Sequence, residues 1–185
     1  MNELGEKAWY AVNTFPGQEN RVRDALERRV ESLNLQDIVF RILVAEHQVE
    51  VEKIKKNVKE IVEVTENLYP GYVFIEMIMT DEAWYIVRNT QGVTGFVGSS
   101  GKGTKPFPIP SVQIEPVLKR MGVVENNMYE RYHVGDVVKI TTGIFADTNG
   151  VILEIDKENA KIKVEVMFYG RPKIFEIEFS NIERI

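Results

Sequence analysis

The chain has 185 residues, of which 44% are hydrophobic and 28% are charged, and its formal net charge is −5. This length fits one medium domain or two small ones, and the apolar content is sufficient for a real core. The lack of cysteine excludes disulfides, a thiolate zinc site and a cysteine nucleophile, and the negative charge argues against a protein that coats nucleic acid by bulk electrostatics.

A strand and an amphipathic helix are predicted at the start of the chain. Residues 9–14 (WYAVNT) alternate and are rich in strand formers, and residues 15–17 (FPG) form a turn. Residues 18–33 then carry apolar side chains at helical spacing: Val22, Ala25, Leu26, Val30 and Leu33. The first residues do not resemble a signal peptide, and no apolar run approaches the roughly 18 residues of a membrane span. We therefore expect a cytoplasmic protein without a membrane segment.

The middle of the chain is predicted to contain strands and one short helix. Residues 40–52 read as a strand, and residues 53–67 read as a charged, hairpin-like excursion. A strand over 72–79 follows, and then a short helix over 80–89 with Asp81 as its N-cap.

A short strand within residues 92–98, a glycine-rich loop over 98–110 and another helix come next. The loop lacks the G-x-x-x-x-G-K-[ST] spacing of a phosphate-binding loop, because Gly98 and Gly101 are too close together. The helix is expected to begin at Ser111, with Pro116 in its first turn, where a missing N–H is tolerated.

The sequence pattern changes after Gly122, and this change predicts two domains. Residues 123–132 are polar and lack a period, so we expect a flexible linker there. Short alternating runs separated by turn signals follow, which is typical of a small closed barrel. The predicted fold class is therefore α+β: residues 1–122 form a sandwich with helices on a mostly antiparallel four-stranded sheet, and residues 133–185 form a β-barrel.

No group of residues has the spacing of a catalytic or metal site. His47 and His133 lie far apart and near no motif, and no two carboxylates stand out as an acid/base pair. We therefore expect a protein that is not an enzyme and that needs no metal or cofactor. The arginines of the first helix favour a solvated face, with a phosphate-contacting face as the alternative: Arg21, Arg23, Arg28 and Arg29.

The stretch NLYPGYVFIEM (residues 67–77) carries more aromatic surface than a turn and a strand require. In a strand, Tyr72 and Phe74 share one face, whereas Val73 and Ile75 share the other and can pack under the helices. Tyrosine is common at protein interfaces because it supplies a large rigid ring with a polar tip. The pattern alone leaves two interpretations open, an exposed docking patch and an ordinary core.

Taken together, these segments resemble the NusG family of bacterial transcription elongation factors. WYAVNTFPGQENRVRDAL is similar to the family's first strand and helix, NLYPGYVFIEM to its F-P-G-Y-V segment, and TDEAWYIVRNTQGVTGFVG to its short helix and next strand. VGDVVKITTGIFADTNGVILEID is similar to the KOW motif, and FYGRPKIFEIEFSNIERI to the end of that domain. The resemblance runs in order over nearly all of the chain.

The resemblance implies an N-terminal NusG (NGN) domain over residues 1–122, a linker over 123–132 and a KOW domain of SH3-like barrel form over 133–185. It implies a factor that binds RNA polymerase through the first domain, on the clamp helices of the largest subunit. Such a factor stays beside the transcription bubble and modulates pausing, elongation, termination and antitermination. The KOW domain would recruit Rho or the ribosomal protein that serves as NusE.

The resemblance also implies which residues carry these roles. The RNA-polymerase-binding surface consists of Tyr69, Pro70, Gly71, Tyr72 and Phe96, with Tyr69 where the family often has phenylalanine. The non-template DNA strand is contacted by Arg88, Asn89 and Thr90, for which a plain helix end closed by Gly92 stays an alternative. The KOW partner surface consists of Phe145, Tyr169, Gly170 and Arg171. Thr148 and the RPKIFE segment depart from the family's pattern and bear on the strength of partner binding.

Two other functions stay open from the sequence. A specialised NusG paralogue with operon-specific recruitment would have domains that mask each other, and a long hydrophobic helical pattern in the last segment would support it. A ribosome-associated, RNA-binding KOW protein would need a basic barrel, whereas the residues from Tyr129 onward carry 8 basic and 10 acidic side chains. The sequence demands no more than a monomer, and it does not indicate whether the protein promotes or suppresses pausing.

Overall fold

The computed structural model describes residues 5–99 and 103–185, and contacts group the chain into two units, Met1–Ile114 and Glu115–Ile185. The division that the sequence predicts, with domains over 1–122 and 133–185 and a linker over 123–132, stays a prediction. Part of the glycine-rich loop, residues 100–102, lies outside the described residues. Within the described ranges, no helix is both long enough and apolar enough to cross a membrane.

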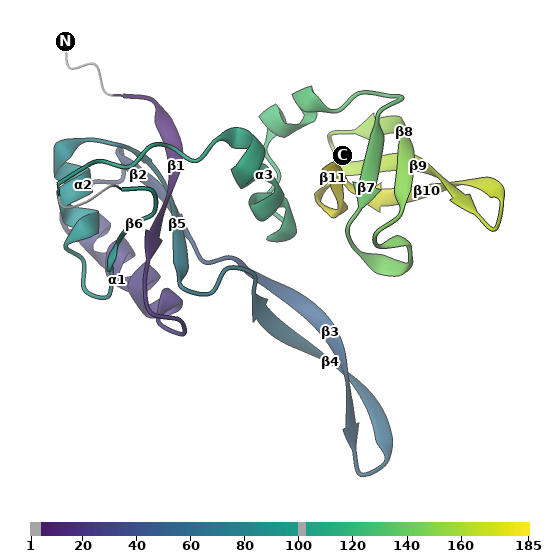
Figure 1. Ribbon diagram of the computed structural model, residues 1–185, viewed down its shortest axis with the longest axis horizontal. Coiled ribbons are helices and arrows are strands. Elements are labelled where there is room, and N and C mark those ends of the chain that lie inside the picture. Colours follow the sequence, from purple (N-terminus) through teal and green to yellow (C-terminus); the bar gives the residue numbers. More distant parts are fainter. Residues whose placement is uncertain (1–4, 100–102) are drawn as a thin grey trace. The chain divides into compact units, whose positions relative to one another are not determined.

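The first unit is built on a four-stranded antiparallel sheet (Figure 1). Its strands lie in the order β2 (Val39–Leu43), β5 (Tyr72–Ile78), β1 (Lys7–Asn13) and β6 (Gly95–Phe96). The two central strands pair along their whole length, from Lys7 opposite Ile78 to Asn13 opposite Tyr72. Both are rich in β-branched and aromatic residues, which suit a pleated and half-buried surface. The antiparallel sheet that the sequence predicts is confirmed.

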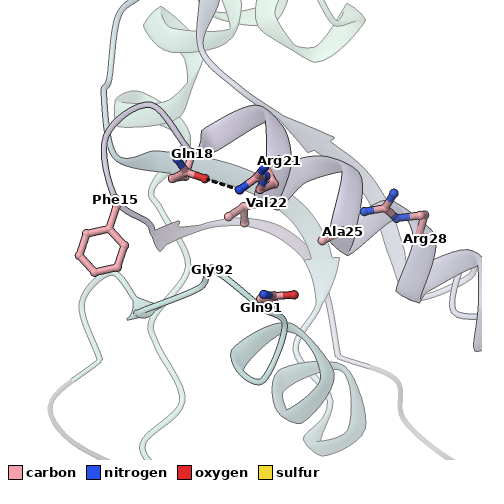
Figure 2. Close-up of a pocket in the computed structure, with 8 residues that line it drawn as sticks. All are labelled: Phe15, Gln18, Arg21, Val22, Ala25, Arg28, Gln91 and Gly92. Atoms are coloured by element: carbon pink, nitrogen blue, oxygen red, sulfur yellow. Dashed lines mark hydrogen bonds between the residues drawn. The ribbon is translucent and has the colours of Figure 1, made fainter.

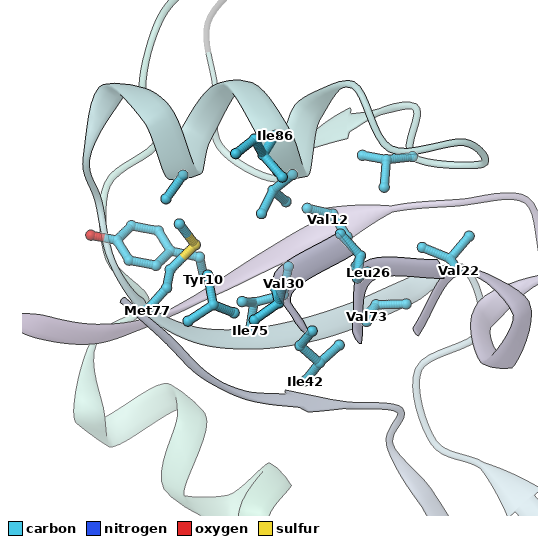
Figure 3. Packing of buried hydrophobic residues seen from close by; sticks show 14 of the residues in the cluster. Tyr10, Val12, Val22, Leu26, Val30, Ile42, Val73, Ile75, Met77 and Ile86 are labelled. Atoms are coloured by element: carbon cyan, nitrogen blue, oxygen red, sulfur yellow. The ribbon is translucent and has the colours of Figure 1, made fainter. Parts of the chain in front are cut away.

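Helices α1 (Glu19–Ser32) and α2 (Asp81–Arg88) contribute their apolar faces to one core with this sheet (Figure 3). Val73 and Ile75 of β5 are fully buried in this core, together with Leu26 of α1 and Val87 of α2. The helical spacing of α1 and the packing of Val73 and Ile75 under the helices are thus confirmed. The other face of β5 is buried as well, at Phe74 and Glu76, so Tyr72 is the one exposed residue of this strand.

Two helix starts differ from the prediction. The N-cap of α2 is Thr80, whose Oγ1 accepts a hydrogen bond from the N–H of Ala83 at 3.1 Å, so the N-cap predicted at Asp81 is wrong. Asp81 is instead the first helical residue, where an acidic side chain favours the positive end of the helix dipole. Pro116 lies inside helix α3 (Ser111–Arg120), beyond the first turn in which it was expected. Because proline has no N–H, the helix lacks one backbone hydrogen bond at this position, whereas in the first turn no hydrogen bond would have been lost.

Residues 40–52, predicted as one strand, are divided between two sheets. β2 ends at Leu43, Val44 and Ala45 are buried, and β3 (Glu46–Lys55) then pairs with β4 (Val58–Asn67) in a separate two-stranded hairpin. The N–H of Leu68 donates to the carbonyl of Ala45 at 2.8 Å and fixes the point where the chain leaves the main sheet. The predicted hairpin-like excursion is therefore confirmed, but it begins seven residues earlier, at Glu46 rather than at Lys53.

The second unit is a five-stranded antiparallel sheet in the order β10, β9, β8, β7 and β11. Its strands are β7 (Val137–Ile140), β8 (Asn149–Asp156), β9 (Lys161–Phe168), β10 (Arg171–Glu178) and β11 (Ile182–Arg184). Two 3-10 turns interrupt it, η2 (Gly143–Phe145) and η3 (Phe179–Asn181). Alternate residues of β9, such as Ile162 and Val164, are buried, so the predicted all-β C-terminal domain is confirmed.

A buried lysine connects the residues that precede this sheet in the sequence to its last strand, β11. Lys119 is 1% exposed, and its Nζ donates to the hydroxyl of Tyr132 at 3.1 Å and to the carbonyl of Ile182. The ring of Phe179 lies 4.2 Å from the ammonium, and the Tyr132 hydroxyl donates to Glu115 at 3.1 Å. Burial lowers the pKa of Lys119 to about 8, against the attraction of Glu115.

A 3-10 helix, η1 (Asn126–Arg131), lies within this network, where the sequence shows no period. Met128 and Tyr129 are buried there, and the ring of Tyr129 stacks on Phe179 at 4.1 Å. The salt bridge from Arg131 to Glu115, with 3.0 Å between Nη1 and Oε2, closes the network.

The buried ammonium predicts that the second unit becomes more stable as the pH rises from about 8. Because the pKa of Lys119 is lower in the folded state, the unfolded state binds more protons between pH 8 and 10. We expect the free energy of unfolding to increase by about 1–2 kcal/mol between pH 7.5 and 9.5. Burial raises the pKa of Tyr132, so the trend reverses above pH 10. Urea unfolding of the full chain, followed by the methyl NMR signals of Ile182, measures this.

Lys119→Met is the matched variant, because it keeps an unbranched side chain in the apolar site and removes the titrating group. Its free energy of unfolding is expected to stay level over the same interval. A wild-type protein whose second unit loses stability between pH 7.5 and 9.5 would contradict a desolvated Lys119.

Candidate partner-binding surfaces

The segment Tyr69–Tyr72 forms a tight turn in front of β5. The N–H of Tyr72 donates to the carbonyl of Tyr69 at 3.2 Å, and Gly71 has a φ of 85°. Proline at the second position and a glycine with positive φ at the third are the features of a type II turn. A Cβ on Gly71 would also lie 3.2 Å from the carbonyl oxygen of Thr14. The turn therefore requires its Pro-Gly pair.

The buried carboxylate of Glu19 holds this turn. Its two oxygens accept the N–H of Gly71 at 2.7 Å and the N–H of Gly17 at 2.9 Å, and the residue is 5% exposed. The carbonyl of Gly71 accepts the N–H of Thr14 at 2.9 Å. Burial raises the pKa of Glu19, but the backbone N–H donors outweigh burial and leave the pKa below its usual value. An ionised carboxylate at the start of α1 thus fixes the turn to the body of the unit.

The two tyrosines of this turn present their rings at the surface. Tyr72 is 37% exposed and Pro70 is exposed, whereas Tyr69 is half-buried. The ring of Tyr69 meets the buried ring of Phe74 edge-to-face, with 5.7 Å between the centroids. We call Tyr69–Tyr72 the docking turn. The structure brings four of the five residues predicted for polymerase binding into this one segment.

Phe96, the fifth residue predicted for polymerase binding, is buried, unlike the exposed residues of the docking turn. It is 5% exposed in β6, opposite Val12, and it belongs to the hydrophobic core. Its side chain therefore supports the sheet, and its predicted contact with a partner stays a prediction that this burial does not favour.

Arg88, Asn89 and Thr90, predicted as DNA contacts, close the C-terminus of α2. Thr90 is 3% exposed, and its hydroxyl donates to the carbonyl of Ile86 at 2.8 Å. Asn89 is exposed, although its Nδ2 donates to the carbonyl of Tyr85 at 2.7 Å, and Arg88 is half-buried. Of the three, Asn89 has the side chain that reaches the surface most fully.

A pocket of about 570 Å³ lies between the first helix and the loop that follows this helix end (Figure 2). It is lined by Phe15, Gln18, Arg21, Val22, Ala25, Arg28, Gln91 and Gly92. A Cβ on Gly92 would lie 2.6 Å from Cγ2 of Val22, so any larger residue at position 92 would clash with this side chain in the lining of the pocket. Two of the four arginines that the sequence singled out therefore line a pocket, which helical spacing alone could not reveal.

A cluster of aromatic rings lies on the second unit. Phe145 lies 4.2 Å from Phe175 and 5.7 Å from Phe168 between ring centroids, and Lys173 Nζ lies 5.2 Å from the centre of the Phe168 ring. The sequence prediction included Phe145 but missed Phe168 and Phe175. Strand pairing brings β9 and β10 side by side, and no local pattern signals which of their aromatics share a face.

Exposed residues surround this aromatic cluster. Tyr169 and Gly170 have φ values of 50° and 75° and form the two-residue loop between Phe168 and Arg171, as in a type I′ hairpin. Tyr169 is 92% exposed at the tip of this loop, and Ile144, which the prediction also missed, is 88% exposed. The hydroxyl of Thr148, at a position that departs from the family's pattern, donates to the carbonyl of Phe145 and so holds the Phe145 loop.

Two family models match the chain. "Transcription termination factor nusG" covers residues 7–118, and "KOW motif" covers residues 134–165. The transcription termination/antitermination protein NusG of Bacillus subtilis is 45% identical over 180 residues, which are 97% of this chain and 99% of that protein. The protein of the same name from Staphylococcus aureus is 44% identical over 99% of this chain and 98% of its own length. A solved structure described as "Domain interaction in Thermotoga maritima NusG" is 36% identical with a TM-score of 0.52, and covers 97% of this chain and 98% of that one.

These similarities extend over both units and confirm the resemblance that the sequence motifs indicated. The first family model spans the four-stranded sheet with the docking turn, and the KOW model spans β7, β8 and part of β9. The chain belongs to the NusG family of transcription termination/antitermination proteins and is a non-enzymatic transcription factor.

Proposed function

We propose that this protein is a general elongation factor that binds bacterial RNA polymerase through the docking turn, on the clamp helices of the largest subunit. The observation that carries the proposal is the Glu19 carboxylate, which fixes a turn bearing two accessible tyrosines. Binding hot spots consist of a few rigid aromatic side chains in a centre from which water is excluded. Because the turn is already fixed in the free protein, little conformational entropy is lost when it binds.

We expect the Tyr69→Ala/Tyr72→Ala double variant to lose most of its affinity for core RNA polymerase. Central aromatic residues at interfaces are each worth about 2 kcal/mol or more, so the dissociation constant should rise at least tenfold. Binding of the full chain and of the variant to purified core enzyme, measured by fluorescence anisotropy, tests this.

Tyr169→Ala is the matched control, because it removes the same side chain from an even more exposed position in the second unit. Its affinity for polymerase is expected to match that of the wild type. If the double variant binds as tightly as this control, the polymerase surface lies elsewhere on the protein. If the wild type does not bind, the proposed function itself is wrong.

The aromatic cluster of the second unit supports a second role, the recruitment of Rho or of NusE. Phe145, Phe168 and Phe175 offer apolar area, and Tyr169 and Arg171 next to them are exposed and offer polar groups. Aromatic residues and arginine are enriched at the centres of interfaces. The cluster lies in a different unit from the docking turn, so each surface has its own set of side chains.

The Phe145→Ala/Tyr169→Ala variant is expected to bind polymerase like the wild type and to bind Rho or NusE at least tenfold more weakly, because both rings contribute contact area. Isothermal titration of the full chain with each candidate partner measures this. The Tyr69→Ala/Tyr72→Ala variant serves as the reciprocal control and should keep its Rho or NusE affinity. A variant that keeps both affinities would remove these two residues from the partner surface.

The non-template DNA strand is the third proposed partner. Asn89 can donate and accept hydrogen bonds at exposed base edges, and the pocket beside it carries Arg21 and Arg28, which can hold phosphate. Arg29 Nη1 donates to the carbonyl of Asn89 at 3.1 Å and fixes the segment against α1. Thr90 is buried, so it takes part only by closing the helix.

Asn89→Ala is expected to change the duration of sequence-dependent pauses without changing polymerase affinity, because each well-placed base contact is worth about 1–3 kcal/mol of discrimination. Single-round transcription with base substitutions in the non-template strand measures this. Gln91→Ala, at the rim of the same pocket, is the comparison variant that keeps Asn89. Pausing that responds to the DNA sequence equally in wild type and Asn89→Ala would exclude base contact by Asn89.

The structure favours this function over the alternatives that the sequence left open. The last segment forms strands β9, β10 and β11 rather than a helix, which supports a general factor over a paralogue with a helical C-terminal segment. The second unit has an excess of acidic residues, which does not suit binding to ribosomal RNA. We infer a cytoplasmic monomer that needs no cofactor, because each proposed role is complete within one chain.

A further inference from the structure

The β3–β4 hairpin extends away from the rest of the first unit (Figure 1). Its strands pair only with each other among the described residues, from Glu46 opposite Asn67 to Lys55 opposite Val58. With 10 residues in each strand, the ribbon is about 30 Å long. A two-stranded ribbon this long is marginally stable alone and buries little apolar surface. Its length therefore calls for a role other than building the core.

The charges of the hairpin are separated along its length. Its tip, residues 53–59, contains four lysines and no acidic residue: Lys53, Lys55, Lys56 and Lys59. Acidic residues border the tip, with Glu60 directly opposite Lys53, and nearer the sheet Glu50 lies directly opposite Glu63. All four lysines are exposed, and in the described part of the chain only Lys59 has an ion-pair partner, Glu52, at 3.5 Å. An acidic protein thus carries one concentrated positive charge at the end of an arm.

The lysines of the tip are distributed around the ribbon. Because side chains alternate between the two faces of a strand, Lys53 and Lys55 lie on one face, and Lys59, paired with Ile54, lies on the other. Lys56 occupies the turn between the strands. Positive charge on both faces does not suit a flat protein surface, which would meet only one of them. It suits a groove that has phosphates on both sides.

The turn at the tip contains a lysine in a backbone conformation that is unfavourable for this residue. Lys56 and Asn57 have φ values of 52° and 63°, so both central residues of the two-residue loop are in the left-handed region. Asn-Gly is the preferred pair for such a loop, and lysine in this conformation is strained. The chain therefore holds a lysine at the outermost position, although asparagine would fit the backbone better.

We propose that the β3–β4 hairpin is an arm whose lysine tip binds the phosphate backbones of duplex DNA. The inference rests on the proposed function, which brings the protein next to the DNA that enters or leaves the polymerase. The major groove is about 12 Å wide and admits a two-stranded β-ribbon, with phosphates along both edges. The contact is independent of base sequence, because lysine meets phosphate as a point charge.

The acidic residues behind the tip limit this contact to the end of the arm. Glu50 and Glu63 would repel phosphates that came closer to the main sheet. The exposed apolar side chains of the tip, Ile54 and Val58, can contact the sugars and bases between the two backbones.

The test uses the full chain and the variant Lys53→Gln/Lys55→Gln/Lys56→Gln, which keeps side chains of similar length and removes three charges. Fluorescence anisotropy measures binding to a labelled 25-base-pair duplex across a salt series that starts at low ionic strength. Each lysine that meets a phosphate contributes about 0.9 to the slope of log K against log salt, so the slope should become shallower by about 2 to 3. We expect affinity for the duplex at the lowest salt to fall at least tenfold.

Lys157→Gln/Lys161→Gln/Lys163→Gln is the matched control, because it makes the same change in net charge within the second unit, at lysines outside the aromatic cluster. It should retain the wild-type slope. Equal losses in both variants would mean that only the total charge matters, and would overturn the proposal. An unchanged slope in the hairpin variant, or lysine-dependent binding to single-stranded RNA but not to the duplex, would overturn it as well.

Binding of the same variants to core polymerase without DNA separates the two hypotheses. The hairpin variant is expected to bind DNA-free polymerase like the wild type. A hairpin variant that loses polymerase binding would show that the tip meets protein and would overturn the DNA contact. If wild-type protein fails to bind polymerase but binds the duplex through its lysines, the proposed function falls and the DNA-binding arm stands.

Discussion

The first unit depends on the ionised carboxylate of Glu19. A buried charge is costly unless hydrogen bonds replace the lost hydration, and here backbone N–H groups from two separate loops do so. The same contact joins the start of α1 and the adjacent loop after β1 to the turn before β5, in which Gly71 lies 52 residues further along the chain. If the carboxylate were absent, the buried N–H of Gly71 would lose its hydrogen-bond partner, and the turn before β5 would lose the contact that holds it. The turn that we propose for polymerase binding is thus held by a side chain that the fold of the first unit also uses.

In both units, exposed tyrosine side chains lie on a tight turn next to an antiparallel pair of strands. In each, a tight turn with a glycine at positive φ carries tyrosine at the end of an antiparallel strand pair, at Gly71 in the first unit and at Gly170 in the second. β5 is buried at every residue after Tyr72, whereas β9 is buried only at alternate residues and no residue of β10 is buried. What differs is the support behind the turn: a buried carboxylate in the first unit, and a row of phenylalanine rings in the second.

The sequence predicted features that depend on local pattern and missed those that depend on pairing between distant segments. The helical spacing of α1, the strand β5 and the turn at residues 15–17 are local, and all three appear in the structure. The division of residues 40–52 at Ala45 could not be read, because alternation continues while the strand changes its partner. The burial of Phe96 and Thr90 and the meeting of Phe168 with Phe145 follow from packing across the sheet and at helix ends, which spacing does not encode.

The distribution of charge is compatible with the proposed DNA contacts of an acidic protein that does not coat DNA. With a net charge of −5, the protein as a whole is repelled by the phosphate backbone, so free DNA attracts it only weakly. The groups that we propose for phosphate contact lie in two small regions of the first unit, the hairpin tip with its lysines and the pocket with Arg21 and Arg28. Such weak contacts would become effective if docking on polymerase raised the local concentration of DNA around them, because the second binding event would then be intramolecular. Under the proposed function, the aromatic docking turn would therefore decide where the protein binds, and the positive charge of the hairpin tip and of the pocket would decide what it contacts there.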